Sequence, residues 1–220
     1  MSGRRVRIAR VKSRRALEHF VDAGYRIRRR SPNYAPPLRR DLLTLLDRDK
    51  HPFHEHAHVD YFLAFRDGRC VGRVAAIENY AHNQFHNERV AFFGFFEAIG
   101  EQEVFSALLE RVEQWARKRR LEAVRGPCSF STNDECGLLV EGFDARHVVM
   151  TPWNPPTWPP LIEGAGYEKA KDLWGWWVDE WNWNERITRI ADRIREKFAS
   201  RGEEVTSRGM DMKDFKAELE

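Results

Sequence analysis

The sequence has few of the features that mark a secreted, membrane-spanning or zinc-binding protein. Its 220 residues include three cysteines (Cys70, Cys128 and Cys136), an odd number without CxxC spacing. This set predicts a reducing, cytoplasmic environment and argues against a disulfide framework or a tetrathiolate zinc site. No apolar run approaches the roughly 20 residues needed to span a bilayer. The basic N-terminus lacks the apolar segment of a secretory signal.

Charge is unevenly distributed along the chain. Residues 1–40 contain thirteen Lys and Arg but two acidic residues, a net charge of +11, so the remainder carries −8 of the overall +3. A basic end on an acidic body favours an anionic partner, such as a membrane surface, a nucleic acid or an acyl-carrier protein. A solvated face of an N-terminal strand and helix explains the same pattern.

Glycine is also scarce at the junction of strand and helix in "AFFGFFEAIGEQEVFSALLERVEQWARKRR" (residues 91–120). Turns that bind phosphate at such junctions are usually rich in glycine, which lets backbone N–H groups approach the anion. Here the turn contains Gly100, with Glu101 and Glu103 beside it. The junction therefore departs from an ordinary phosphate-binding loop.

Apolar periodicity predicts an alternating chain. We expect strands at 4–11, 59–65, 70–77, 89–99, 122–126 and 167–179, and helices at 13–30, 38–46, 101–119, within 155–166 and at 184–202. Three strands in series, then a helix, a strand, a short helix and a strand predict an α/β fold. Its centre would be a mixed β-sheet with helices on both faces.

Five stretches cover roughly residues 15–175: "YAPPLRRDLLTLLD", "HPFHEHAHVDYFLAFRDGRCVGRVAAI", "AFFGFFEAI", "RGPCSFSTNDECGLLVEGFD" and "NPPTWPPLIEGAGYEKAKDL". These stretches and the element order resemble the GNAT (GCN5-related N-acyltransferase) superfamily. More narrowly, they are similar to its YghO-like bacterial group, which is related to bacterial ceramide synthases. The resemblance implies a sheet whose strand before the long helix splays from its neighbour and admits acyl-CoA. It implies acyl transfer to an amine, for example a long-chain amino base.

The resemblance also narrows the expected partners. Acyl-CoA would be a cosubstrate, with no tightly bound cofactor and no metal. An acyl-carrier protein is an alternative donor, the acceptor amine is a candidate lipid, and nucleic acid is not expected. "AIGEQEVFSALL" keeps only Gly100 of the family's Q/R-x-x-G-x-G/A loop. Three interpretations follow: a donor held by its acyl chain and pantetheine arm, a protein-carried donor, or a catalytically degenerate binding or scaffold domain.

Candidate catalytic residues follow from what amide formation needs, a base and donors to the oxyanion. Glu97 ends the central strand where a GNAT cleft opens, although it is equally a candidate for a solvent-facing strand end. Asn133 and Glu135 lie in "STNDECG" and suit a polar headgroup, or a turn. In the family a tyrosine near the short helix often acts as the acid; this chain has Trp158 there, so Tyr167 is the nearest phenol.

Candidate donor-binding residues come from the same resemblance. The aromatic strand predicts acyl-thioester contacts at Phe95 and Phe96, and the following turn predicts contacts at Gly100 and Gln102. Asn154 matches the region that contacts pantetheine in GNAT proteins, and it also suits a helix N-cap.

Two rival sites are visible in the sequence. His54, His56 and His58 would share one strand face, a spacing that suits zinc or copper, but no complementary Cys or Glu pattern accompanies them. Cys128 and Cys136 are candidate acyl-accepting thiols without a nearby histidine. Both are weaker hypotheses than the acyl-transfer site.

We predict a GNAT-like domain at 1–180, a linker helix at 181–202, and at 203–220 the start of a second, truncated GNAT-like unit. Seven of the eight tryptophans fall between Trp153 and Trp183. Together with the basic N-terminal arm, Trp174, Trp176 and Trp177 predict peripheral contact with an anionic membrane at the inner face. Core packing on the strand expected at 167–179 is the alternative for these rings.

Overall fold

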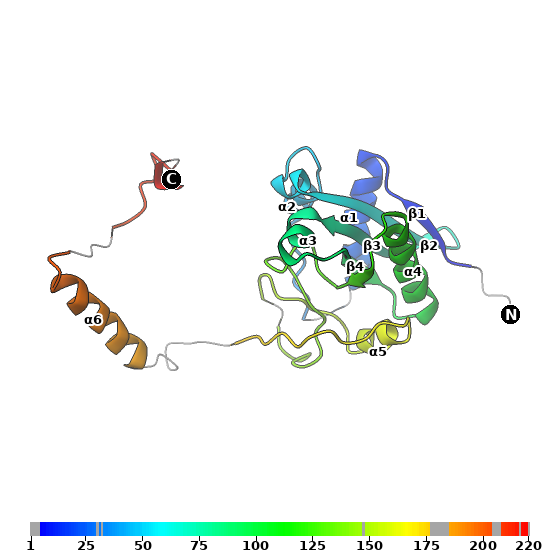
Figure 1. The fold of residues 1–220 in the computed structure, drawn as a ribbon. Coiled ribbons are helices and arrows are strands. Elements are labelled where there is room, and N and C mark those ends of the chain that lie inside the picture. The colour runs from blue at the N-terminus through cyan, green and yellow to red at the C-terminus, as the bar shows by residue number, and fades with distance from the viewer. Residues whose placement is uncertain are drawn as a thin grey trace. The chain divides into compact units, whose positions relative to one another are not determined.

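A computed structural model describes residues 5–29, 31, 33–146, 148–176, 185–203, 208–215 and 217–219. The chain divides into two units, Met1–Lys171 and Asp172–Glu220 (Figure 1). The predicted domain boundaries at 180 and 202 remain predictions. Among the described residues, no helix is both long and apolar enough to cross a membrane.

The first unit is built on a five-stranded sheet in chain order. The strands are β1 (Arg7–Arg10), β2 (Ala57–Arg66), β3 (Arg69–Asn79), β4 (Val90–Ala98) and β5 (Ala123–Arg125). Neighbours from β1 to β4 are antiparallel. Strands β4 and β5 are parallel and pair through Val90–Phe92 and Ala123–Arg125. The C-terminal part of β4, residues 93–98, therefore has no partner in β5. The prediction of a mixed sheet is confirmed.

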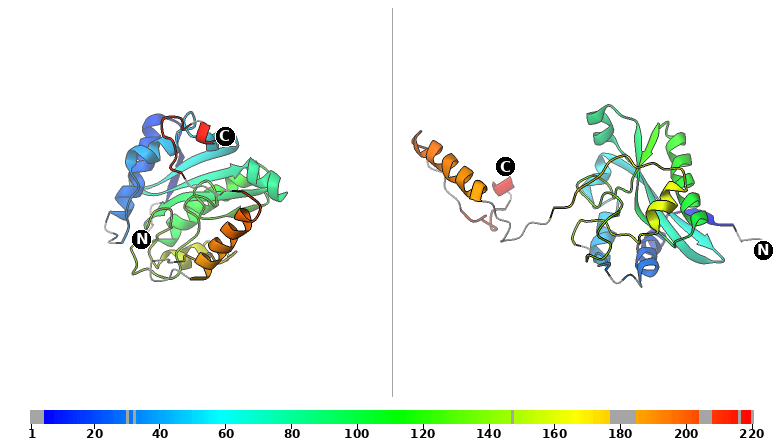
Figure 2. Two further views of the ribbon diagram at one scale, coloured as in Figure 1. Left: turned by 90° about the vertical axis from the view of Figure 1, so that its left-hand side faces the viewer. Right: turned by 90° about the horizontal axis from the view of Figure 1, so that it is seen from below.

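Helices cover both faces of this sheet, as predicted (Figure 2). One face packs against α1 (Arg14–Arg28) and α2 (Arg39–Leu45), the other against α4 (Gln102–Lys118) and α5 (Trp158–Glu163). Successive strand residues point to opposite faces, so Ala75 and Ile77 join the α1 cluster while Val74 and Ala76 join the α4 cluster. Ser13 caps α1 by accepting from the Ala16 N–H at 3.2 Å.

Two short elements were not predicted, and one predicted strand is wrong. The sequence analysis missed the 3₁₀ turn η1 (Pro52–Glu55) and the helix α3 (Tyr80–His86). The sequence signal for α3 was an asparagine at each end. The Asn79 side-chain oxygen accepts from the His82 N–H at 3.0 Å, and Asn87 ends the helix in a left-handed conformation. Residues 167–176 form no strand; the end of that predicted strand lies outside the described residues.

A bulge shapes the middle of β4. Its pairing register with β3 shifts between Arg73 and Ala75, and Phe95 has φ +45°. A Cβ on Gly94 would lie 2.1 Å from the Cys128 carbonyl oxygen, so only glycine admits the following loop this close. The Phe95 N–H donates to the Ser129 hydroxyl at 3.1 Å. The bulge thereby fixes the directions in which the side chains at the end of β4 point.

The second unit contains the helix α6 (Glu185–Ala199) and the short turn η3 (Ala217–Leu219). Helix α6 matches the helix expected at 184–202. Its apolar residues Ile187, Ile190 and Ile194 are exposed. The start of a second GNAT-like unit at 203–220 remains a prediction, since residues 204–207, 216 and 220 lie outside the described residues.

Candidate active site

Glu97 lies at the end of β4 and is buried between two arginines. Arg28 Nε donates to Glu97 Oε2, and Arg73 Nη2 lies 3.6 Å from Glu97 Oε1. Arg73 also donates to the Phe20 carbonyl at 3.0 Å. Since Glu97 and Arg73 are each only 4% exposed, the solvent-facing alternative for Glu97 is wrong. The carboxylate joins α1, β3 and β4 through charge-assisted contacts.

Arg28 is enclosed by aromatic rings. Its guanidinium carbon lies 4.5 Å from the ring centre of Tyr34, 4.9 Å from Trp158 and 5.7 Å from Trp153. Burial, assisted by the charge on Glu97, raises the pKa of Tyr34 to about 12. The cluster is therefore a fixed charge set in an aromatic shell, an environment in which electrostatic interactions are strong.

Glu135 brings a second carboxyl to this cluster from the loop after β5. As a residue it is exposed, yet surrounding protein removes enough water from the carboxyl to raise its pKa. Arg28 and Arg73 oppose this shift, and Glu97 adds to it. A solvent-accessible carboxyl with a raised pKa is better suited to proton transfer near neutral pH than an ordinary glutamate.

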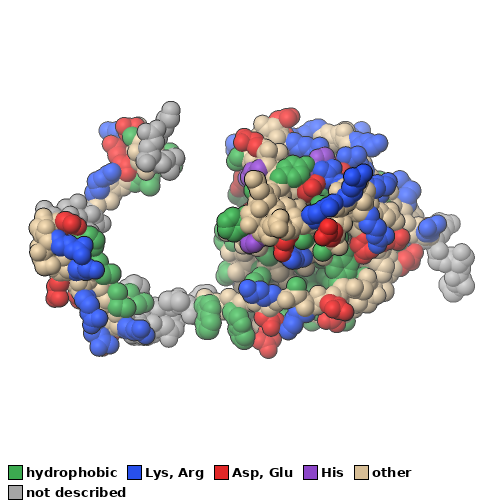
Figure 3. All heavy atoms as spheres, in the orientation of Figure 1, with side chains coloured by type: hydrophobic (Ala, Val, Ile, Leu, Met, Phe, Trp, Pro, Cys, Tyr) green, Lys and Arg blue, Asp and Glu red, His purple; other side chains and the backbone are tan. Residues whose placement is uncertain are grey.

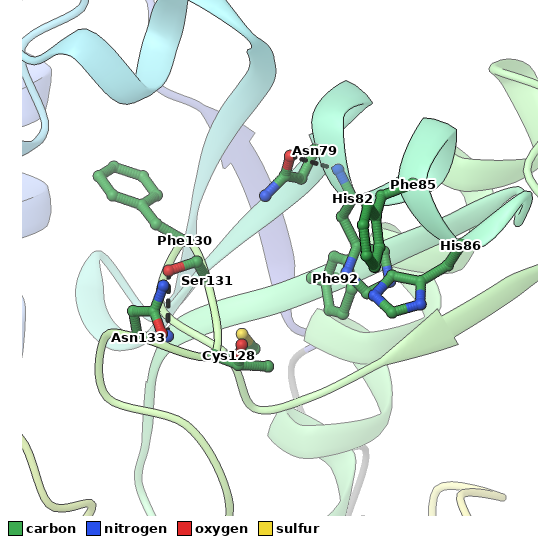
Figure 4. A pocket seen from close by; sticks show the side chains of 10 residues that line it. Asn79, His82, Phe85, His86, Phe92, Cys128, Phe130, Ser131 and Asn133 are labelled. Atoms are coloured by element: carbon green, nitrogen blue, oxygen red, sulfur yellow. Dashed lines mark hydrogen bonds between the residues drawn. The ribbon is translucent and has the colours of Figure 1, made fainter. Parts of the chain in front are cut away.

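Asn133 lines a separate cavity of about 200 Å³ between α3 and the loop (Figure 4). Its backbone N–H donates to Ser131 Oγ at 3.2 Å, and Ser131 Oγ donates to Asp134 at 2.6 Å. The turn role expected for this segment is thus present. The cavity is lined by Asn79, His82, Phe85, His86, Phe92, Cys128, Phe130, Ser131, Thr132 and Asn133, which include neither Glu97 nor Glu135.

Tyr167 lies on the α4 face, apart from Glu97 on the α1 face. Its ring centre is 5.5 Å from that of Phe93, within the cluster that packs on α4. The hydroxyl is buried and has no hydrogen-bond partner of acceptable geometry, although Glu113 lies nearby. Burial, with the charge of Glu113, raises its pKa and keeps the phenol protonated.

The predicted donor-binding residues are mostly engaged in packing. Phe96 is buried against Phe105 and Trp158, and Phe95 contacts Phe130 with ring centres 4.9 Å apart. Gly100 lies beside Thr157.

The two predicted amides bind backbone groups. Gln102 donates to the Leu161 carbonyl at 3.0 Å and so ties α4 to α5. Asn154 accepts from the Leu139 N–H at 2.7 Å and donates to the Leu139 carbonyl at 3.1 Å. Because Thr157 is the N-cap of α5, the N-cap alternative for Asn154 is wrong.

Arg66, which the sequence analysis overlooked, neutralises the acidic start of α4. It makes a bidentate pair with Glu101 at 2.6 and 2.7 Å and lies 3.9 Å from Glu103. Pairing with Arg66 therefore reduces the repulsion that Glu101 and Glu103 would exert on a bound diphosphate. The available signal in the sequence was the position of Arg66 at the end of β2, just before the turn into β3.

The histidine site is not assembled. His54 lies in η1, His56 ends it, and only His58 lies in β2, so the prediction of one shared strand face is wrong. Each ring has its own neighbours: His54 contacts Phe130, and His58 stacks on Trp115. No group of three or more His, Cys, Asp or Glu side chains suited to a metal ion occurs within the described part of the chain.

Comparison with known proteins identified relatives that are similar to this chain in sequence. No protein-family model matches the chain. It is 33% identical to the bacterial ceramide synthase of Caulobacter vibrioides over 211 residues, covering 96% of this chain and 54% of that protein. It is 30% identical to Protein YghO of Escherichia coli over 177 residues, covering 77% of this chain and 44% of that protein. The chain thus spans about half the length of the curated relatives it matches.

A solved structure described as a probable acetyltransferase aligns with 80% of this chain and 97% of its own, at 13% identity and a TM-score of 0.46.

Proposed function

We propose that the chain is an N-acyltransferase of the GNAT type, because it is similar to the bacterial ceramide synthase and to Protein YghO over about half of each. It would transfer an acyl group from acyl-CoA, or from an acyl carrier, to an amine. The similarity to a ceramide synthase across 96% of the chain carries this proposal. The same similarity supports a long-chain amino base as the acceptor.

Glu135 takes the central chemical role in this proposal. An ammonium must lose a proton before its nitrogen attacks the thioester carbonyl carbon and the C–S bond breaks. Glu135 is accessible and has a raised pKa, whereas both oxygens of Glu97 face arginines. We assign proton acceptance to Glu135, with Glu97 positioning Arg28. Asn133 stays a candidate headgroup contact.

Tyr167 stays a candidate proton donor to the departing thiolate, but it packs on the α4 face, whereas Glu97 and the arginines near Glu135 lie on the α1 face. Its hydroxyl is buried without a hydrogen-bond partner, and buried polar groups of this kind call for a functional explanation. Rings of Phe93, Phe96 and Trp158 lie on the same α4 face. All three are buried against one another and against α4, so an acyl chain or pantetheine arm would reach them only if this core opened.

A non-catalytic GNAT-like binding domain is the second candidate. Two observations favour it: the amides of Gln102 and Asn154 are taken by backbone groups, and the turn before α4 has a single glycine. Such a domain would bind a partner or lipid without turnover.

Calorimetric titration separates these candidates at the donor step. We expect palmitoyl-CoA to bind and free CoA to bind more weakly, because the acyl chain supplies apolar contact area. Saturation-transfer NMR with the same ligands would identify the acyl protons nearest the protein. Absence of binding by both ligands would reject the acyl-CoA donor and favour the non-catalytic domain.

A further inference from the structure

Cys128 and Cys136 face each other across a tight hairpin in the loop after β5. They form an antiparallel bridge. On either side of it, the Ser129 N–H donates to the Glu135 carbonyl at 2.8 Å and the Gly137 N–H to the Pro127 carbonyl at 2.8 Å. These backbone hydrogen bonds thus flank the cysteine pair, while the backbone groups of the two cysteines exchange none. This is the non-hydrogen-bonded type of cross-strand pair.

That type of pair has the geometry a disulfide requires. Directly opposed residues in such pairs have Cα atoms about 4.5 Å apart and side chains on the same face. Disulfides bridge Cα separations of about 4.4–6.8 Å. Both thiols are free in this structure. At the separation typical of such pairs, a disulfide can form without a large movement of the backbone.

The two thiols differ in reactivity. Cys136 is partly exposed, and hydrogen bonding from the Cys128 thiol lowers its pKa to about 7. Cys128 is 3% exposed, and the same contact and burial raise its pKa. Cys136 therefore supplies a thiolate that an oxidant can reach, and Cys128 stands beside it as the resolving thiol.

We propose that Cys128 and Cys136 form a reversible dithiol–disulfide site that a peroxide oxidises. The Cys136 thiolate attacks one peroxide oxygen, the O–O bond breaks, and hydroxide leaves and takes up a proton as Cys136 becomes a sulfenic acid. The Cys128 sulfur then attacks the Cys136 sulfur and an S–S bond forms. The sulfenic oxygen leaves with the thiol proton as water. Two thiols and one hydrogen peroxide give one disulfide and two waters.

This inference goes beyond acyl transfer and does not depend on it. The hairpin packs directly on the β4 bulge, where the Cys128 N–H donates to the Phe93 carbonyl at 2.7 Å. A disulfide would add a covalent cross-link to the hydrogen bonds that already hold the segment carrying Glu135. A reductant of the thiol class would restore the pair.

The test is peroxide treatment of the whole chain followed by differential alkylation and peptide mass spectrometry. Cys70 is the internal control, because its partly buried thiol has no cysteine opposite it and burial raises its pKa. We expect loss of two hydrogens and one Cys128–Cys136 linkage, with Cys70 still alkylated and dithiothreitol reversing the change. Equal alkylation of all three cysteines after peroxide would overturn the proposal, as would linkages between chains.

Two variants distinguish the proposed order of events. In Cys128→Ser, Cys136 should form a sulfenic acid that dimedone traps, because the resolving thiol is gone. In Cys136→Ser, Cys128 should stay reduced at peroxide concentrations that oxidise the wild type. Cys70→Ser should behave as the wild type. A dimedone adduct on Cys128 in Cys136→Ser, formed as readily as the Cys136 adduct in Cys128→Ser, would contradict the assigned roles.

Discussion

Arg28 and Arg73 hold Glu97 in an environment that local sequence does not reveal. Glu97 was correctly expected at the end of the central strand, but Arg28 lies 69 positions away and its contact depends on the packing of α1. Arg73 interrupts the otherwise apolar "CVGRVAAI", and a lone arginine in a buried strand was the available signal. Polar partners across the fold decide what a candidate residue does.

The first residue-scale prediction concerns Glu135. Glu135→Gln should lower kcat for amide formation by roughly 10²-fold or more, because the amide cannot accept the ammonium proton. Circular dichroism should show an unchanged fold, since the residue as a whole is exposed and glutamine has nearly the same size as glutamate. Glu141→Gln, also exposed on this loop, is the matched control and should retain activity. Full activity in Glu135→Gln would remove it from the mechanism.

The second residue-scale prediction concerns Glu97. Glu97→Gln leaves two buried arginines without their carboxylate and should reduce the free energy of unfolding by about 3 kcal/mol. Glu101→Gln removes an exposed pair with Arg66 and should cost less than about 1 kcal/mol. Urea denaturation measures both. A Glu97→Gln variant of wild-type stability that has lost turnover would instead make Glu97 the base.

Elements with strong apolar periodicity were predictable, and elements defined by their ends or partners were not. Helix α4, expected at 101–119 from its apolar periodicity, buries a stripe made of Val104, Phe105, Leu108, Leu109, Val112, Trp115 and Ala116. Helix α3 was missed because it buries none of its residues and offers no apolar period. The strand expected at 167–179 is rich in aromatic residues, but 167–176 has no pairing strand among the described residues. Residue types that favour strands do not supply a pairing partner.

Asp60 connects three elements and gives the prediction at this scale. It accepts from Arg10 on β1 at 2.6 Å and from the Trp115 indole on α4 at 2.8 Å. Burial alone would raise its pKa, but these hydrogen bonds outweigh burial and lower it. A lowered folded-state pKa contributes stability above the unfolded value of about 3.9, and this is lost as pH falls through the folded value.

We therefore expect the stability difference between wild type and Asp60→Asn to be full at pH 7 and to shrink as the pH falls below about 4. Urea denaturation at several pH values measures it. A difference that stays constant or grows toward low pH would show that Asp60 does not contribute through its charge.

At the scale of the whole molecule, part of the positive charge of residues 1–40 is neutralised by ion pairs within the protein. Arg10, Arg14 and Arg39 pair with acidic side chains, and Arg28 is enclosed. Figure 3 shows basic and acidic side chains interspersed over the first unit. Trp174 and Trp176, however, are 74% and 84% exposed, so the core-packing alternative is wrong for them. Trp177 lies outside the described residues.

Peripheral membrane contact remains a prediction that these exposed groups support. Flotation should recover the protein with anionic liposomes at low salt and less at high salt, because each basic residue near the surface contributes about 1 kcal/mol at most. Lys12→Glu with Arg15→Glu, both exposed, should reduce recovery. Equal recovery with neutral vesicles, or no recovery with anionic ones, would show that the basic residues of 1–40 form a solvated face and not a membrane contact.

Amide formation tests the central claim most directly. The protein is incubated with palmitoyl-CoA and a long-chain amino base, and mass spectrometry quantifies the N-acyl product while a thiol reagent quantifies released CoA. We predict equimolar amide and CoA thiol above the rate without protein. Release of CoA thiol without amide, or the absence of both products under conditions in which palmitoyl-CoA binds, would contradict the assignment as an N-acyltransferase.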